Sequence, residues 1–248
     1  MNLFLRFLKR FVELIAKDKA SFVFAELVDY VTPTVTQVTS RGTLKFFCPG
    51  PLPEWRAKTL LTKEPETLEW IEGFSEEECL WDIGANVGAF TRAFVKAGRT
   101  PKLVLSFEPS SYVFSILRIV TKRLDKVQCH KIALSSKAGT VDLQTPIKAS
   151  GSLRVGLSHI GTASDGDTLT ETVPTRRLDD FLADQGIESV DVVKMDVEGA
   201  EQMVVDGAPD LLKRIRPLWY VEIDESRAQR FGDSAQMLFA TFTGNGYK

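Results

Sequence analysis

The sequence predicts an α/β fold with a doubly wound, mostly parallel Rossmann-like sheet, preceded by an N-terminal extension of helices and a β-hairpin. Two observations support this fold class. From residue 79 onward, short apolar segments of strand length alternate with segments whose apolar residues recur at helical spacing. The segment 190–195 contains the continuous apolar pattern of a strand buried on both faces, with Lys194 as the odd residue. We therefore expect the extension to span residues 1–73 and the sheet domain residues 74–248.

The composition is that of an ordinary globular protein. The 248 residues are 44% hydrophobic and 26% charged, and the formal net charge of −2 arises from interspersed charges of both signs. This balance argues against a broad nucleic-acid-binding surface, so no nucleic-acid partner is expected. The three cysteines, Cys48, Cys79 and Cys129, lie far apart, which favours reduced thiols and a cytoplasmic location over a disulfide framework.

Residues 2–17 have the pattern of an amphipathic helix, with apolar residues every three or four positions and charged residues on the other face. The charges interrupt the apolar stretch that a secretory signal needs, and no uncharged run approaches the roughly 20 residues of a membrane-spanning helix. Two alternatives stay open for the apolar face. It packs on the rest of the chain or on a second subunit, or it lies on an anionic membrane surface.

The other elements follow from β-branched runs, helical spacing and turn residues. In the extension we expect a short helix at 21–30, hairpin strands at 34–39 and 43–47, a break at the proline-rich segment 49–53, and two short helices, the second at 65–73. The strands expected in the sheet domain are 79–83, 103–107, 127–134, 190–195 and 218–223. The expected helices are 90–97 ending at Gly98, a helix capped by Ser110, 178–183 closed by Gly186, one beginning at 199–205, and 235–243. Residues 135–176 are the least regular part, with a short extra strand at 140–143 and a loop at 151–167.

A turn with two glycines follows the first strand of the sheet domain, in the segment Trp81-Asp82-Ile83-Gly84-Ala85-Asn86-Val87-Gly88. The glycines allow the backbone to approach a ligand closely, and the next helix offers its N-terminal amides. A nicotinamide-binding turn would carry a further glycine at the position of Asn86. The acid Asp82 at the strand end suits a ligand that carries positive charge better than it suits a pyrophosphate.

Two further acidic positions follow other strands. Glu108 lies 20 residues after Gly88, where a carboxylate can accept hydrogen bonds from the two hydroxyls of a ribose. Asp196 and Glu198 follow the fourth strand two positions apart, so in extended backbone both project to one side, one toward a cofactor and one toward an acceptor. A magnesium site built from these two carboxylates is an alternative, but it lacks a clear third ligand.

With these motifs, the segment from Trp81 to about Glu222 resembles the FkbM-type family of S-adenosylmethionine-dependent methyltransferases. The matching pieces are 82–88 (DIGANVG), 107–109 (FEP), 132–135 (IALS), 178–181 (LDDF) and 194–201 (KMDVEGAE). The resemblance implies the class I methyltransferase fold, S-adenosyl-L-methionine as cofactor, and O-methylation of a hydroxyl on a sugar, a polyketide or a similar small metabolite. The family continues into a final pair of strands beyond the last helix, so we expect the sheet of this chain to lack its last strands.

The resemblance also implies roles for individual residues. Asp82, Gly84 and Asn86 would line the methionine portion of the cofactor, and Glu108 would hold the ribose. Ala133 and Ser135 would lie near the adenine, and Asp196 near the sulfonium and its methyl group. The full set of expected cofactor-binding residues is Asp82, Ile83, Gly84, Ala85, Asn86, Gly88, Glu108, Pro109, Ala133, Ser135 and Asp196.

A hydroxyl acceptor benefits from a general base, for which the candidates are His159, Glu198 and Glu222. For His159, a solvated loop residue without a catalytic role is an alternative of at least equal weight. His130 is expected to be a structural residue. We expect a small-molecule or carbohydrate acceptor and no resident metal, and residues 2–17 are the segment for a membrane or homo-oligomer contact. A nicotinamide-dependent oxidoreductase and a non-catalytic binding protein that retains the fold are the alternative functions.

Overall fold

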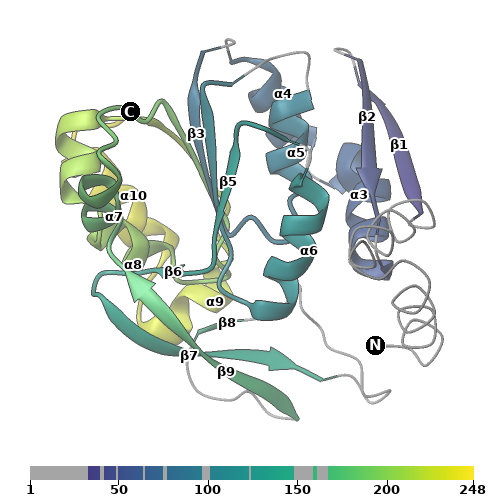
Figure 1. The fold of residues 1–248 in the computed structure, drawn as a ribbon. Coiled ribbons are helices and arrows are strands. Elements are labelled where there is room, and N and C mark those ends of the chain that lie inside the picture. The colour runs from purple at the N-terminus through teal and green to yellow at the C-terminus, as the bar shows by residue number, and fades with distance from the viewer. Residues whose placement is uncertain are drawn as a thin grey trace, which may run out of the picture.

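A five-stranded parallel sheet forms the centre of the protein (Figure 1). The computed structural model describes residues 33–39, 42–48, 50–63, 65–74, 77–96, 101–122, 124–147, 159–160 and 167–248. The helices predicted at 2–17 and 21–30 lie outside the described residues, so both alternatives for the amphipathic segment stay predictions.

The strands of the central sheet are β3 (Cys79–Ile83), β4 (Leu103–Phe107), β5 (Val127–His130), β10 (Val192–Met195) and β11 (Leu218–Val221). They pair in the order β11-β10-β3-β4-β5, and every neighbouring pair is parallel. From β3 the chain adds β4 and β5 on one side and then β10 and β11 on the other, so the predicted doubly wound fold is confirmed. Both β3 and β4 have the predicted bounds, whereas β10 begins later and β11 ends earlier than predicted.

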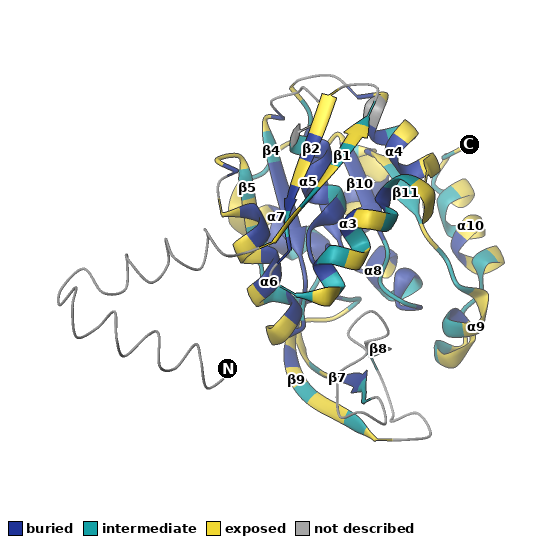
Figure 2. Cartoon of the chain, turned by 90° about the vertical axis from the view of Figure 1, so that its right-hand side faces the viewer, coloured by how far each residue is buried: buried dark blue, intermediate teal, exposed yellow. Residues whose placement is uncertain are grey.

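Alternate residues of the central strands face two apolar layers. Leu80, Val104 and Val192 face a layer made by β2 (Gly42–Phe47), α3 (Pro51–Lys63), α4 (Pro65–Glu72) and α5 (Ala89–Lys96). The opposite face packs on α7 (Leu178–Gln185), α8 (Glu201–Asp206), the π-helical turn Leu211–Ile215 and α10 (Ala235–Gly244). Because both faces are covered, β4 and β10 carry mainly buried residues (Figure 2).

The N-terminal layer contains the predicted hairpin, in which β1 (Thr34–Thr39) pairs antiparallel with β2. The break predicted at 49–53 is wrong, because α3 already begins at Pro51. Proline is tolerated in the first turn of a helix, where its missing N–H has no intrahelical partner in any case. The helix predicted at 65–73 is confirmed as α4.

A second sheet of four strands lies beside the carboxyl ends of the central strands (Figure 1). Its strands are β6 (Ala133–Leu134), β7 (Gly139–Pro146), β8 (His159–Ile160) and β9 (Thr168–Arg176), in the order β6-β9-β7-β8. The single strand predicted at 127–134 is therefore wrong, since it divides between two sheets. The region 135–176 is also more regular than predicted, because β7 and β9 form a long antiparallel pair.

Two helices have the caps predicted for them, whereas Gly98, predicted to end the helix at 90–97, lies outside the described residues. Helix α6 (Ser111–Thr121) begins after Ser110, whose side chain accepts a hydrogen bond from the backbone N–H of Val113. Helix α7 ends at Gly186, which has φ +61°. The short helices α9 (Glu225–Ala228) and Gln229–Phe231 were not predicted, because each is too short to show a period in the sequence.

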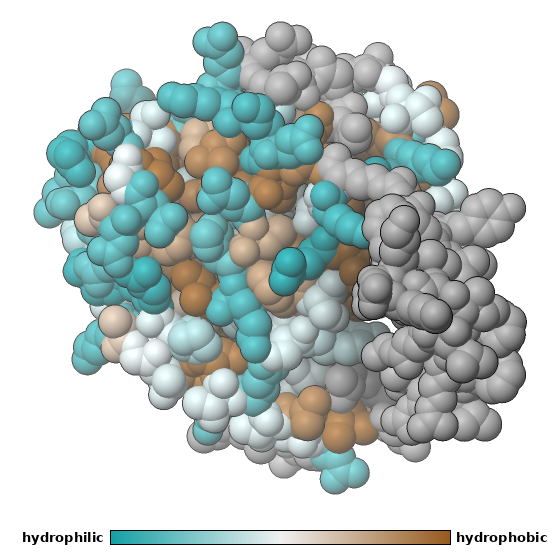
Figure 3. Space-filling model, viewed as in Figure 1, coloured by the Kyte–Doolittle hydropathy of each residue, from teal (hydrophilic) through white to brown (hydrophobic). Residues whose placement is uncertain are grey.

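Large hydrophobic side chains that remain exposed are spread over separate elements, as shown by Val38 on β1, Leu169 on β9 and Phe239 on α10. On the face seen in Figure 3, hydrophobic residues reach the surface at several places among hydrophilic ones. Scattered exposure of this kind is normal for globular proteins. Within the described ranges, no helix has the length and hydropathy needed to cross a membrane.

Candidate functional site

A cavity lies at the carboxyl ends of β3, β4 and β10, next to the second sheet. It contains about 670 Å³ of space between side chains, part of it open to solvent. Its lining residues are Ile83, Gly84, Asn86, Phe107, Glu108, Pro109, Ile132, Ala133, Leu134, Leu143, Ile160, Asp196, Val197, Glu198 and Ala200. Ligands of open α/β sheets bind at this edge, where the strand order reverses.

The turn after β3 forms part of the cavity wall and depends on Gly84. This residue has φ +76°, and a Cβ added to it would lie 1.8 Å from the backbone carbonyl oxygen of Asp196. Only glycine therefore allows the β3 turn and the β10 turn to pass so closely. Asn86 also has a positive φ, +51°, and its side-chain oxygen accepts a hydrogen bond from the N–H of Val87 at 2.8 Å. Asparagine tolerates this left-handed conformation better than most residues.

Glu108 joins the turns after β3 and β4. One carboxylate oxygen accepts a hydrogen bond from the N–H of Asn86 at 3.1 Å, and the other accepts one from the N–H of Ser110 at 2.9 Å. The residue is 8% exposed, yet it lines the cavity. Burial is the main reason that the pKa of Glu108 is raised to about 7; the two N–H groups oppose this shift, and the negative charges of Asp82 and Asp196 add to it.

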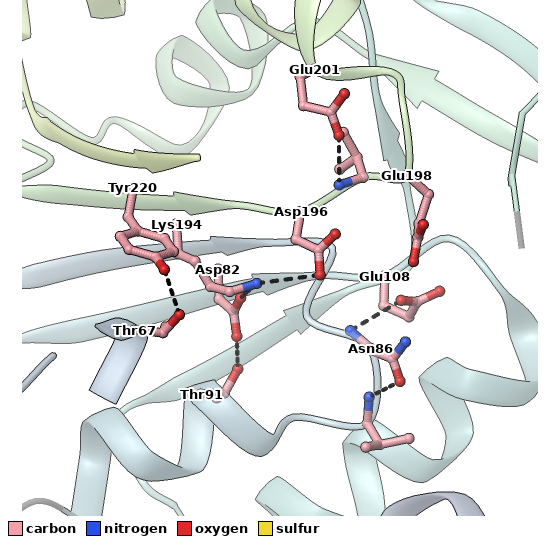
Figure 4. A network of polar contacts seen from close by, with 12 residues as sticks. Thr67, Asp82, Asn86, Thr91, Glu108, Lys194, Asp196, Glu198, Glu201 and Tyr220 are labelled. Atoms are coloured by element: carbon pink, nitrogen blue, oxygen red, sulfur yellow. Dashed lines mark hydrogen bonds and ion pairs between the residues drawn. The ribbon is translucent and has the colours of Figure 1, made fainter. Parts of the chain in front are cut away.

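Asp82 lies behind the cavity wall and does not line it. It is fully buried, and its carboxylate accepts a hydrogen bond from the Thr91 hydroxyl at 2.5 Å. Its other oxygen is 3.9 Å from the ammonium nitrogen of Lys194 (Figure 4). Burial raises the pKa of Asp82, and the positive charge of Lys194 opposes this shift. The structure thus brings Glu108 and Asp196 to one cavity and leaves Asp82 in the layer behind it.

Asp196 and Glu198 both line the cavity, but the predicted extended backbone is wrong. β10 ends at Met195, and Glu198 lies in a turn with φ +59°. The carboxylate of Glu198 forms an ion pair with Arg227 of α9. The adjacent Gly199 permits this contact, because an added Cβ would lie 2.8 Å from the backbone carbonyl of Arg227.

Glu201 fixes the turn that carries these two carboxylates. It is the first residue of α8, is 2% exposed, and does not line the cavity. One of its oxygens accepts hydrogen bonds from the N–H groups of Val197 at 3.3 Å and Gly199 at 3.1 Å. A carboxylate at a helix N-terminus is favoured by the same unpaired N–H groups, so Glu201 acts on the shape of the site from behind it.

Several other predicted site residues do not line the cavity. Ala85 and Gly88 belong to the buried side of the β3 turn, and the N–H of Ser135 donates to the carbonyl of Arg176 in the second sheet. Glu222 follows β11, and its N–H donates to the carbonyl of Met195. The backbone of His159 in β8 pairs with that of Gln144 in β7, and the His159 side chain lies outside the described part of the chain.

His130 has the structural surroundings expected for it. Its ring stacks on Phe107 with centroids 5.4 Å apart and meets Phe181 edge-on at 4.8 Å. Burial lowers the pKa of His130, which keeps the ring neutral in this aromatic cluster.

Comparison with known proteins identifies the family. The model of the methyltransferase FkbM domain matches residues 82–248. The chain belongs to the FkbM methyltransferase family. This confirms the resemblance that the sequence motifs predict, and the first and last of those motifs are the two turns that meet at Gly84.

Two curated relatives illustrate the range of this FkbM family. The chain is 31% identical over 147 residues to the 2-O-methyltransferase NoeI of Sinorhizobium fredii, covering 54% of this chain and 59% of NoeI. It is 28% identical over 166 residues to the hexuronic acid methyltransferase AglP of Haloferax volcanii, covering 65% of this chain and 62% of AglP. A crystal structure of the methyltransferase FkbM from Methylobacillus flagellatus matches 82% of this chain and 48% of its own at 16% identity, with a TM-score of 0.44. The chain spans less than two thirds of the length of either curated relative.

The part of this FkbM-family site that sequence reasoning missed is apolar. Leu143 on β7 and Ile160 on β8 line the cavity together with Ile132 and Leu134. No turn motif marks these positions, and only the period-2 alternation of β7 could have indicated that Leu143 is buried. Among the residues that the structure describes, no group of three or more His, Cys, Asp or Glu side chains could hold a metal ion.

Proposed function

We propose that this FkbM-family protein uses S-adenosyl-L-methionine to methylate a hydroxyl group of a sugar or another small, hydroxyl-bearing metabolite. The observation that carries the proposal is one cavity that combines the carboxylates of Glu108 and Asp196 with an apolar wall. The names of the two relatives, a 2-O-methyltransferase and a hexuronic acid methyltransferase, support the reaction and the acceptor class. The cofactor would supply a methyl group already activated on sulfur, so the contribution of the protein is mainly positioning.

The residues present fit such a cofactor. Each oxygen of Glu108 accepts one backbone N–H, and each has a further lone pair for a ribose hydroxyl. Asp196 supplies negative charge for a cationic ligand, and the apolar side chains of Leu134 and Leu143 offer surface for a purine ring. The same set fits a pyrophosphate poorly, because the carboxylates would repel it, and this disfavours the nicotinamide alternative.

Glu198 is our preferred partner for the acceptor hydroxyl. Of the three candidate bases it is the one whose described side chain lines the cavity. Its ion pair with Arg227 fixes the direction of the Glu198 carboxylate. A carboxylate held in this way can accept the hydrogen bond of a hydroxyl and orient it for transfer. Replacing Glu198 by Gln should therefore lower turnover without abolishing cofactor binding, whereas an equal effect on both would remove it from this role.

Calorimetry with S-adenosylhomocysteine tests the cofactor assignment. Since the pKa of Glu108 is about 7, its carboxylate is largely protonated at pH 6 and largely ionised at pH 8. Ribose hydroxyls donate to the ionised form, so affinity should rise about tenfold from pH 6 to pH 8. In Glu108→Gln, the free energy of binding should become less favourable by about 1–3 kcal/mol at pH 8. The affinity of this variant should also depend much less on pH.

The control is Glu69→Gln, which changes an exposed carboxylate on α4 away from the cavity and should behave as the wild type. Absence of any heat of binding for the wild-type chain at both pH values would refute the proposed cofactor. A change in NADH fluorescence on mixing would instead favour the oxidoreductase alternative. A chain that binds S-adenosylhomocysteine but methylates no hydroxyl acceptor would be the non-catalytic binding protein.

A further inference from the structure

A row of polar side chains crosses one face of the parallel sheet, with one residue from each strand. In sheet order, the register places as neighbouring partners Tyr220, Lys194, Asp82, Ser106 and Cys129. Threonine hydroxyls from the covering helices contact the row: Thr67 at 2.9 Å from the Tyr220 hydroxyl, Thr91 at 2.8 Å from the Ser106 hydroxyl, and Thr121 at 3.3 Å from the sulfur of Cys129. Most of the row is therefore satisfied by uncharged partners. Lys194 is its one cation.

Lys194 lies between two carboxylates of different kinds. Its side chain is 3% exposed, and its ammonium nitrogen is 3.9 Å from Asp82 Oδ1 and 3.9 Å from Asp196 Oδ2 (Figure 4). The nitrogen also lies 4.9 Å from the centre of the Phe90 ring, over its face. Asp82 is buried behind the wall, whereas the Asp196 side chain is 19% exposed and lines the cavity.

A structural ion pair inside the sheet would need only Lys194 and Asp82. The second carboxylate gives the three groups a net charge of −1, and that charge is located where the cavity begins. The charge of Asp196 also raises the pKa of Asp82, Glu108 and Glu201, so Asp196 repels each of these three carboxylates. Without a cation behind it, the Asp196 side chain would be driven away from the other three.

We propose that Lys194 is a positioning residue for the cofactor site: it holds the carboxylate of Asp196 at the cavity wall, where one negative charge is left for a cationic cofactor. This inference rests on the proposed function, because it assumes that the ligand is a sulfonium. It assigns a role to the residue that is out of place in an otherwise apolar strand. The buried Asp82 shares the ammonium and keeps Lys194 directed toward the cavity end of β10.

The experiment compares the wild type with the double variant Asp82→Asn, Lys194→Met. The double variant removes one negative and one positive charge, so the net charge of the group stays at −1 and no buried charge is left unpaired. Affinities for S-adenosylmethionine and S-adenosylhomocysteine are measured by calorimetry, and folding by circular dichroism. The two ligands differ by the charge on sulfur, so the ratio of their affinities reports the position of the Asp196 carboxylate.

If Lys194 positions Asp196, the double variant should lose at least about tenfold in affinity for S-adenosylmethionine, and clearly less for S-adenosylhomocysteine. The matched control is Thr91→Val, which disrupts the same buried row at Asp82 without touching Asp196. It should lower thermal stability and leave the affinity ratio unchanged.

A folded double variant that keeps both affinities within about twofold would overturn the inference, as would an equal change of the ratio in Thr91→Val. If the double variant does not fold, Asp82→Asn with Lys194→Gln replaces it, since the amide satisfies its buried neighbour while the charge is removed. For this second variant we expect the same loss of S-adenosylmethionine affinity, and affinities within about twofold of the wild type would again overturn the inference. Failure of the wild type to bind either ligand would count against the proposed function and leave no role for Lys194 toward a cofactor.

Discussion

The cavity has two walls that differ in origin. One wall consists of turns at the ends of parallel strands and carries Gly84, Asn86, Glu108 and Asp196. The other comes from the second sheet and carries apolar side chains, of which Leu143 is the most deeply buried. The first wall is built from hydrogen bonds and charges over short stretches of chain. The second depends on strands that meet only after the sheet has formed.

This difference explains why the sequence predicts the polar wall of the cavity better than the apolar wall. A turn of few residues must satisfy its own backbone, so its glycines and acids are fixed in type and spacing. An apolar wall asks only for side chains of suitable volume, which many sequences can supply. We therefore expect stability and ligand affinity to depend on backbone conformation in the polar wall, and on side-chain volume in the apolar wall.

The largest effect is expected from Gly84→Ala. The added Cβ would overlap the carbonyl oxygen of Asp196, and the residue would keep a positive φ of +76°. Strain and overpacking together should cost about 4 kcal/mol or more of unfolding free energy. Gly186→Ala is the control, because Gly186 has φ +61° with no atom within 4 Å of the added Cβ, and it should lose only about 1 kcal/mol. Similar losses in urea unfolding for both variants would contradict the close contact between the two turns.

An intermediate effect is expected from Leu143→Ala on the apolar wall. Leu143 is 3% exposed and packs on Ala133 and Val173, so its truncation should cost about 2–3 kcal/mol of stability. It should also weaken S-adenosylhomocysteine binding severalfold, because the cavity loses part of its lining. Val141→Ala removes apolar volume from the same cluster without lining the cavity, and should lower stability alone. Unchanged affinity in Leu143→Ala would show that the ligand does not reach the second sheet.

The smallest effect is expected where β9 of the second sheet contacts the start of helix α6. Glu171 of β9 accepts hydrogen bonds from the N–H of Ser111 at 2.9 Å and from its hydroxyl, and lies 3.4 Å from the Lys131 ammonium. Because these groups are partly exposed, Glu171→Gln should cost about 0.5–1 kcal/mol, and less at high salt. Asp142→Asn, which changes a contact within the second sheet alone, is the control. If the loss of stability in Glu171→Gln does not become smaller at high salt, the contact of Glu171 with Ser111 and Lys131 is not mainly electrostatic.

Much of the fold was predictable because local rules determine it. Ser110 and Gly186 mark a helix start and a helix end by their own hydrogen bonding and backbone freedom, and both positions are confirmed. β9 was not predicted, although its threonines favour a strand, because its polar residues show no clear apolar alternation. At Pro51 the sequence predicted a break where the structure has a helix, because a proline that breaks the interior of a helix also fits its first turn.

The sequence by itself determined the parallel α/β fold, the glycine turn and the acids at the strand ends, because strand periodicity and turn chemistry act between residues close in the chain. Tertiary structure decided which acids line the cavity. Asp82 and Asp196 both lie near the ends of neighbouring strands, yet one is buried against Thr91 and the other lines the cavity. It also decided that Lys194 lies between them and that Leu143 completes the opposite wall. These outcomes depend on burial and on charges brought together across strands, which no spacing along a single chain records.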